Sequence, residues 1–129
     1  MTNKQVIVAD KAPKAVGPYS AGIQTGNLVF TAGQIGLDRE TGKMVEGGVE
    51  AQARQVLFNL QNVLESGGAS LGSVVKTTVF LADMADYAKV NAIYAEYFTD
   101  TPPARSAVQV AGLPLGALVE IEAIALVEG

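Results

Sequence analysis

The residues best suited to chemistry are one cation and two carboxylates near the C-terminus. Arg105 follows two prolines and opens an alternating segment, 105–111, that is typical of a buried strand. It is the only lysine or arginine after Lys89, and its guanidinium keeps its charge inside a protein. Because no acidic residue lies two positions away, its planar fork is suited to a carboxylate or phosphate from elsewhere. A structural ion pair, or a head group in water, is the alternative.

Glu120 and Glu122 lie in a second predicted strand, 118–128, and their spacing puts both on one strand face. Either could meet Arg105 or a water molecule beside it. A partly desolvated glutamate has a raised pKa and can act as a base toward water near neutral pH. Solvation at a sheet edge, or pairing with Lys76 or Arg54, is the alternative, and the sequence does not separate the two glutamates.

Three further residues have both a structural and a functional interpretation. Tyr19, in the segment GPYS, is either an aromatic plug in a loop or a lid and hydrogen-bond donor. Gly33, in TAGQIG, indicates either a bulge at a strand end or a close approach of the backbone to a ligand. Asn91 is a polar residue among apolar helix positions, where it caps a neighbouring loop or contacts a ligand.

The residue types that the chain lacks narrow its chemistry. With no histidine and no cysteine, it has no thiol nucleophile, no histidine base and none of the usual ligands of transition-metal sites. We therefore expect no metal site. The net charge is −4 and no lysine or arginine cluster is present, which argues against nucleic acid as the main partner.

The chain length and hydrophobicity predict one globular domain, 1–129. No apolar run approaches the roughly 20 residues that span a bilayer, and the N-terminus lacks the apolar region of a secretory signal. Together with the absence of cysteine, this favours a cytoplasmic protein that does not enter the membrane.

Hydrophobic periodicity predicts the elements that must position these residues. We expect the order β-β-β-α-β-α-β-β, with a hairpin turn at Gly26-Asn27 and with Asp83 capping the second helix. The predicted strands are 5–9, the two arms of a hairpin within 21–36, 73–82, 105–111 and 118–128, and the predicted helices are 49–66 and 83–98. Two helices of about four turns on one face of a six-stranded sheet make a two-layer α+β domain.

The last predicted strand has one clean apolar side and one mixed side. The apolar side carries Val119, Ile121, Ala123 and Ala125, and the mixed side carries Leu118, Glu120, Glu122, Ile124 and Leu126. Monomers rarely expose such a combination of charged and large apolar groups, so we expect an oligomer that closes over this face.

Several segments, taken in order, resemble the Rid family of reactive intermediate deaminases over nearly the whole chain. These segments are GPYS, TAGQIG, QARQVLFNLQNVLE, VVKTTVFLADM, PPARSAVQVAGLP and VEIEAIA. The resemblance is closest to the archetypal imine and enamine deaminases. It implies a chorismate-mutase-like fold, a homotrimer with sites between subunits, and cofactor-free hydrolysis of 2-iminoacids to 2-ketoacids and ammonia.

The resemblance also implies a role for individual positions. Arg105 matches the arginine that clamps the substrate carboxylate, and Glu120 matches the acidic residue that positions or activates water. Tyr19 matches an aromatic from the neighbouring subunit, whereas Gly33 and Asn91 match pocket positions. Ala107, often cysteine in relatives, would make a backbone contact with the substrate, and Ala32 is often serine. A trimeric module that binds 2-ketoacids without turnover is the alternative function.

Overall fold

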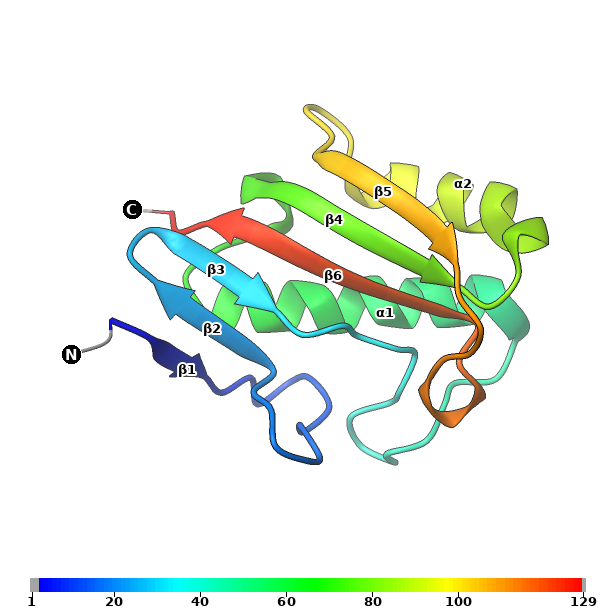
Figure 1. The fold of residues 1–129 in the computed structure, drawn as a ribbon, viewed down its shortest axis with the longest axis horizontal. Helices are drawn as coiled ribbons and strands as arrows, with labels where there is room; N and C mark the ends of the chain where they lie inside the picture. Colours follow the sequence, from blue (N-terminus) through cyan, green and yellow to red (C-terminus); the bar gives the residue numbers. More distant parts are fainter. Residues whose placement is uncertain (1–2, 129) are drawn as a thin grey trace.

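The computed structural model describes residues 3–128, which form a six-stranded sheet with two α-helices (Figure 1). The helices are α1 (Gly48–Ser66) and α2 (Tyr87–Tyr97). The strands are β1 (Gln5–Ile7), β2 (Gly22–Thr25), β3 (Leu28–Thr31), β4 (Val74–Leu81), β5 (Ala104–Gln109) and β6 (Val119–Leu126). Short 3-10 turns occupy Leu71–Ser73, Met84–Asp86 and Pro114–Gly116.

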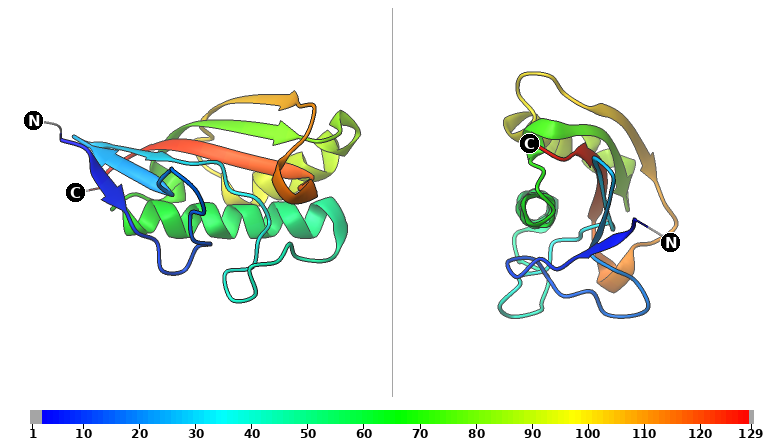
Figure 2. Two further views of the ribbon diagram at one scale, coloured as in Figure 1. Left: turned by 60° about the horizontal axis from the view of Figure 1, so that its bottom comes forward. Right: turned by 90° about the vertical axis from the view of Figure 1, so that its left-hand side faces the viewer.

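The strands lie in the order β1-β2-β3-β6-β4-β5, and only the β4–β5 pair is parallel. Helix α2 makes the crossover that a parallel pair requires. Figure 2 shows both helices on the same side of the curved sheet. The predicted element order, the mixed six-stranded sheet and the turn at Gly26-Asn27 are therefore confirmed.

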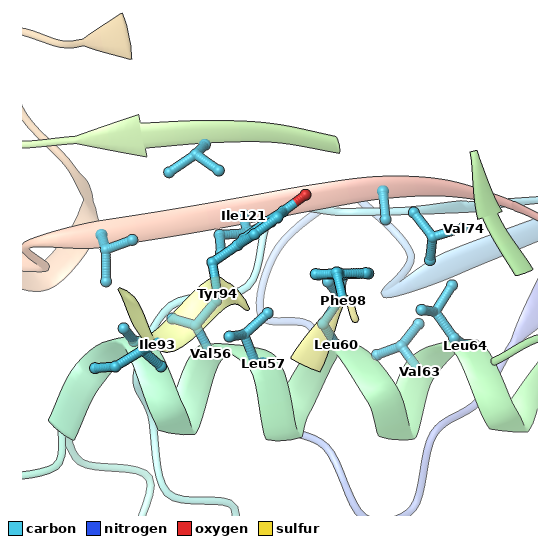
Figure 3. Close-up of a cluster of buried hydrophobic side chains, with 14 of the residues drawn as sticks. Val56, Leu57, Leu60, Val63, Leu64, Val74, Ile93, Tyr94, Phe98 and Ile121 are labelled. Atoms are coloured by element: carbon cyan, nitrogen blue, oxygen red, sulfur yellow. The ribbon is translucent and has the colours of Figure 1, made fainter. Parts of the chain in front are cut away.

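Helix α1 lies along the sheet and supplies one wall of the core (Figure 3). The apolar residues that recur at helical spacing along it form one stripe, which is buried throughout, namely Val49, Ala53, Val56, Leu57, Leu60, Val63 and Leu64. These side chains meet the predicted apolar side of β6, where Val119, Ile121, Ala123 and Ala125 are also buried. Burial of each large aliphatic side chain contributes about 1.5–3 kcal/mol, so this contact supplies much of the energy that holds the sheet in place.

The other face of the sheet carries large apolar side chains that the described residues leave exposed. Phe30, Val108 and Leu126 have relative exposures of 38%, 43% and 40%. In the right-hand view of Figure 2 the helices lie on the opposite side, away from this face. The mixed character predicted for the outer side of β6 is thus present in the structure.

Two predictions about the elements near Arg105 are wrong in detail. Strand β5 is an edge strand with no buried residue, because its second edge has no partner strand among residues 3–128. The second helix is also shorter than expected. Asp83 caps the 3-10 turn Met84–Asp86 through the amide of Ala85, so the α-helix begins only at Tyr87.

Within residues 3–128, neither α1 nor α2 is long and apolar enough to cross a bilayer.

Candidate active site

Arg105 lies on the helix-facing side of the sheet, because its backbone pairs with that of Thr77, whose side chain is buried under α2. Its Nη1 donates to Oδ1 of Asn91 at 2.8 Å, and its Nη2 donates to the hydroxyl of Tyr87 at 2.7 Å. The guanidinium carbon also lies 4.8 Å from the ring centroid of Tyr94. Polar and aromatic groups of α2 therefore fix the direction of the fork without neutralising its charge.

This arrangement removes one interpretation of each of two predicted residues. Within residues 3–128, Arg105 has no acidic partner, so the structural ion pair is not present in this chain. Asn91 does not cap a loop but accepts a hydrogen bond from Arg105, so the capping interpretation was wrong. Sequence reasoning did not identify Tyr87. Nothing in the sequence links its hydroxyl to Arg105, because the contact depends on how α2 crosses β5.

Tyr94 contacts the guanidinium of Arg105 through the face of its ring. Its hydroxyl lies 2.7 Å from Oγ1 of Thr77, in a buried hydrogen bond that fixes the ring. Burial raises the pKa of the Tyr94 hydroxyl, which keeps the ring neutral beside the cation. The face of a neutral aromatic ring carries partial negative charge. It therefore attracts the guanidinium of Arg105 in a cation–π interaction.

Glu120 lies on the opposite face of the sheet. Its neighbours Val119 and Ile121 are fully buried on the helix side, so the alternation of β6 turns Glu120 outward. Within one chain, Glu120 and Arg105 are therefore on different faces, and the expectation that either glutamate meets Arg105 does not hold inside a chain. The proposed pairing with Lys76 or Arg54 is also absent, because Lys76 bonds to Ser106 and Arg54 to Glu96.

Gly33 lies in a bulge beside Glu120. The β3–β6 ladder pairs Phe30 with Ile124 and then Gln34 with Ile121, so one extra residue lies on the β3 side. Such a bulge bends the strand and brings its backbone close to a neighbouring side chain. A Cβ built on Gly33 would lie 2.6 Å from Cδ of Glu120. The bulge interpretation of Gly33 therefore applies. The close approach in the structure is to Glu120, and an approach of this backbone to a ligand stays a prediction.

The two glutamates of β6 differ in their surroundings. Glu120 is partly buried, and this burial, followed by the charge of Glu122, raises the pKa of its carboxyl. Glu122 is exposed. A carboxylate with a raised pKa is a better proton acceptor than an ordinary one, so Glu120 is the glutamate suited to act as a base.

A cavity of about 340 Å³ contains Glu120, Gly33 and Tyr19 among its lining residues. Tyr19 is 55% exposed, and its hydroxyl accepts a hydrogen bond from the amide of Val16 at 3.4 Å. Its hydroxyl proton remains available as a donor, in keeping with the lid interpretation.

Helix α1 anchors the loop that forms the floor of this cavity. The buried amide of Asn59 donates to the carbonyls of Ile35 and Leu37 at 3.1 and 2.9 Å, and both of those residues line the cavity. The buried Gln52 accepts from the amide of Leu118 at 2.9 Å and so fixes the start of β6. Sequence reasoning missed both residues, although each is a polar interruption in the apolar stripe of α1.

Leu115, which also lines this cavity, has an unusual backbone. Its φ is 55°, the only left-handed value of a non-glycine residue within 3–128, and its side chain is 74% exposed. A left-handed conformation costs about 1–2 kcal/mol for a residue with a Cβ. The loop therefore holds an apolar side chain in water at an energetic cost.

Arg105 and Asn91 line a second, shallower groove of about 380 Å³, together with Pro102 and Pro103. Among the described residues, none lines both this groove and the cavity around Glu120. Ala107 lines neither, and packs against the core from the helix-facing side of β5. The predicted site residues thus form two groups, an anion-binding fork on one face and a carboxylate base on the other.

The chain is similar to known proteins over nearly its whole length. Residues 9–127 match the family described as Endoribonuclease L-PSP. The chain belongs to this family, which includes the Rid proteins. It is 50% identical over 123 residues to the mouse protein named 2-iminobutanoate/2-iminopropanoate deaminase, covering 95% of this chain and 91% of the relative.

Two solved Rid-family structures show the same fold. RidA from an Antarctic Psychrobacter has a TM-score of 0.91 and 47% identity, covering 95% of this chain and 98% of that one. Escherichia coli TdcF with bound serine has a TM-score of 0.90 and 42% identity, again covering 95% and 98%. The similarity confirms the predicted α+β fold of the chorismate-mutase-like type.

Proposed function

We propose that this protein hydrolyses reactive 2-iminoacids and their enamine tautomers to 2-ketoacids and ammonia. Its substrates would include 2-iminobutanoate and 2-iminopropanoate, the compounds in the names of its mouse, human and rat relatives. The observation that carries the proposal is the pair of half-sites, an arginine fork without an acidic partner and a glutamate with a raised pKa. Hydrolysis of an iminoacid needs a carboxylate clamp and an oriented water, which these two groups can supply.

In the proposed mechanism, Nη1 and Nη2 of Arg105 each donate a hydrogen bond to the substrate carboxylate. Glu120 accepts a proton from a water molecule as that water adds to the electrophilic imine carbon. The resulting tetrahedral intermediate takes this proton back from Glu120 onto its nitrogen. Glu120 then accepts the proton of the new hydroxyl group and passes it to the nitrogen, so that ammonia leaves as the carbonyl forms. A positioned base of this kind contributes about 10²–10⁴-fold to the rate. None of these steps requires a metal or a covalent intermediate.

Assembly of the complete site follows from the same proposal. Since the two half-sites are on opposite faces of one chain, a neighbouring copy must bring Tyr19, Gly33 and Glu120 to the groove of Arg105 and Asn91. We propose a homotrimer whose sheets face inward and whose sites lie between subunits. The exposed apolar residues of the outer sheet face support such a contact. The absence of cysteine is in keeping with action in the cytoplasm.

A coupled assay tests the function directly. A threonine dehydratase generates 2-iminobutanoate, and its loss is followed with and without this protein. We expect wild type to accelerate the loss and Arg105→Ala to abolish the acceleration while its assembly stays intact. Arg54→Ala is the matched control and is expected to leave activity unchanged, because Arg54 is in an exposed ion pair with Glu96 and lines neither the cavity around Glu120 nor the groove of Arg105. Full activity in Arg105→Ala would rule out the carboxylate clamp.

The same assay addresses the alternative of a metabolite-binding module without turnover. The names of the relatives do not favour that alternative. A wild-type protein that binds a 2-ketoacid but never accelerates imine loss would nevertheless establish it in place of the deaminase.

A further inference from the structure

Leu115 has properties that the fold does not account for. It lies in the 3-10 turn between β5 and β6, where the following residue, Gly116, also has a left-handed φ, of 68°. Glycine at position 115 would adopt the same backbone without strain. The leucine side chain is not part of the hydrophobic core and is largely exposed. The backbone strain and the exposed apolar surface therefore point to a role for this side chain in the cavity that it lines.

The chemistry of the cavity indicates what Leu115 would contact. In the proposed function, Arg105 takes the substrate carboxylate and Glu120 lies near the imine carbon, so only the substrate side chain remains unassigned. The remaining lining includes Val16, Ile35 and Pro114, which together with Leu115 make an apolar wall. Val16, like Leu115, is exposed, at 85%. An apolar substrate side chain would cover both residues.

The size of the cavity bears on the length of that side chain. In one chain, before a neighbouring copy adds the groove of Arg105, its volume is about 340 Å³, which is more space than a three- or four-carbon iminoacid fills. A methyl or ethyl group would leave most of the apolar wall in water. A longer apolar side chain would reach it.

We propose that Leu115 is a specificity-determining residue that contacts the substrate side chain, so that this protein prefers 2-iminoacids with long apolar side chains. This inference rests on the proposed deaminase function. The preferred substrates would be the products of enzymes that oxidise amino acids such as leucine to the corresponding 2-iminoacid.

The test compares two iminoacids, generated in situ by an amino acid oxidase from leucine and from alanine. We expect wild type to have the higher kcat/KM with the leucine-derived iminoacid. Leu115→Gly and Leu115→Ala should both lower that value about ten-fold, mainly through KM, because each deletes apolar contacts of the size that a pocket uses to discriminate substrates. The value for the alanine-derived iminoacid should hardly change. Leu113→Ala, in the same loop but outside the cavity lining, is the matched control.

The two variants also separate the side chain from the backbone. Leu115→Gly relieves the left-handed strain and is expected to be at least as resistant to heat as wild type, whereas Leu115→Ala keeps the strain. The role of the Leu115 side chain would be overturned if either variant kept the wild-type preference for the leucine-derived iminoacid. The deaminase function would still stand in that case. A wild type that accelerates loss of neither iminoacid would instead remove the proposed function and this inference with it.

Discussion

Replacing Gly33 by alanine tests whether the position of Glu120 matters for catalysis. The new Cβ would lie 2.6 Å from Cδ and 2.9 Å from Cγ of Glu120, whereas ordinary contacts begin near 3.4 Å. The carboxyl group must therefore retreat by about 1 Å, a displacement that can lower a rate by about 10²-fold when it affects a reacting group. We expect kcat for 2-iminobutanoate to fall by about that factor. KM should change little, because Arg105 is untouched.

The fold should tolerate this change. Gly33 does not have a left-handed φ, and the atoms in its way belong to a side chain that can rotate. Gly112→Ala is the matched control, because its Cβ would meet nothing within 4 Å and its φ is not left-handed either. The measurement is steady-state kinetics together with thermal unfolding of both variants.

A double variant sharpens the interpretation. If Gly33→Ala acts through Glu120, adding it to Glu120→Gln should cause no further loss, because the two changes remove the same function. A folded Gly33→Ala protein with wild-type kcat would refute the reasoning. So would a double variant whose losses multiply.

Three further predictions concern the groups around the two half-sites. The pKa of Glu120 is raised in the folded protein, so ionisation of this carboxyl lowers the free energy of unfolding. This loss of stability is absent at pH values below the ordinary pKa of 4.5 and is complete once the pH exceeds the raised pKa. Glu120→Gln should therefore unfold at a higher temperature than wild type at pH 8 but not at pH values below about 4, as measured by calorimetry; an equal difference at both would contradict this. Tyr87→Phe removes one hydrogen bond to Arg105 and should raise KM about 2- to 10-fold with little change in kcat, whereas an unchanged KM would count against the positioning role. Asn59→Ala leaves the partly buried carbonyls of Ile35 and Leu37 without their donor and should lower the free energy of unfolding in urea by about 1–3 kcal/mol. For Asn62→Ala we expect about 0.5 kcal/mol or less, because the hydrogen bonds that Asn62 donates are exposed. Equal losses in the two asparagine variants would show that the anchoring of the cavity floor is unimportant.

Local patterns in the sequence were sufficient to predict most of the fold. The apolar stripe from Val49 to Leu64 and the alternation from Val119 to Ala125 each bury one face, and a one-residue shift would expose it. The helix start at Tyr87 was missed because Asp83 caps a 3-10 turn instead, and local residue preferences do not separate the two kinds of helix start.

The candidate site was less predictable because its contacts depend on register between distant strands. Alternation places Glu120 and Glu122 on one side of β6, but only the pairing of Thr77 with Arg105 reveals that Arg105 faces the helices. The same pairing brings Arg105 beside Tyr87. Glu120 is partly buried whereas Glu122 is exposed. This difference is also hidden in the sequence, because the residues beside Glu120, such as Gly33, are far from it along the chain.

Mixing two inactive variants tests the central claim, that Arg105 of one copy and Glu120 of another complete each site. Arg105→Ala and Glu120→Gln would be purified separately, then unfolded and refolded together in equal amounts so that subunits exchange. If partners assort at random, about one site in four receives an intact Arg105 and an intact Glu120 from different chains. We predict recovery of roughly that fraction of wild-type activity in the mixture. A mixture as inactive as its two components would contradict a site shared between subunits.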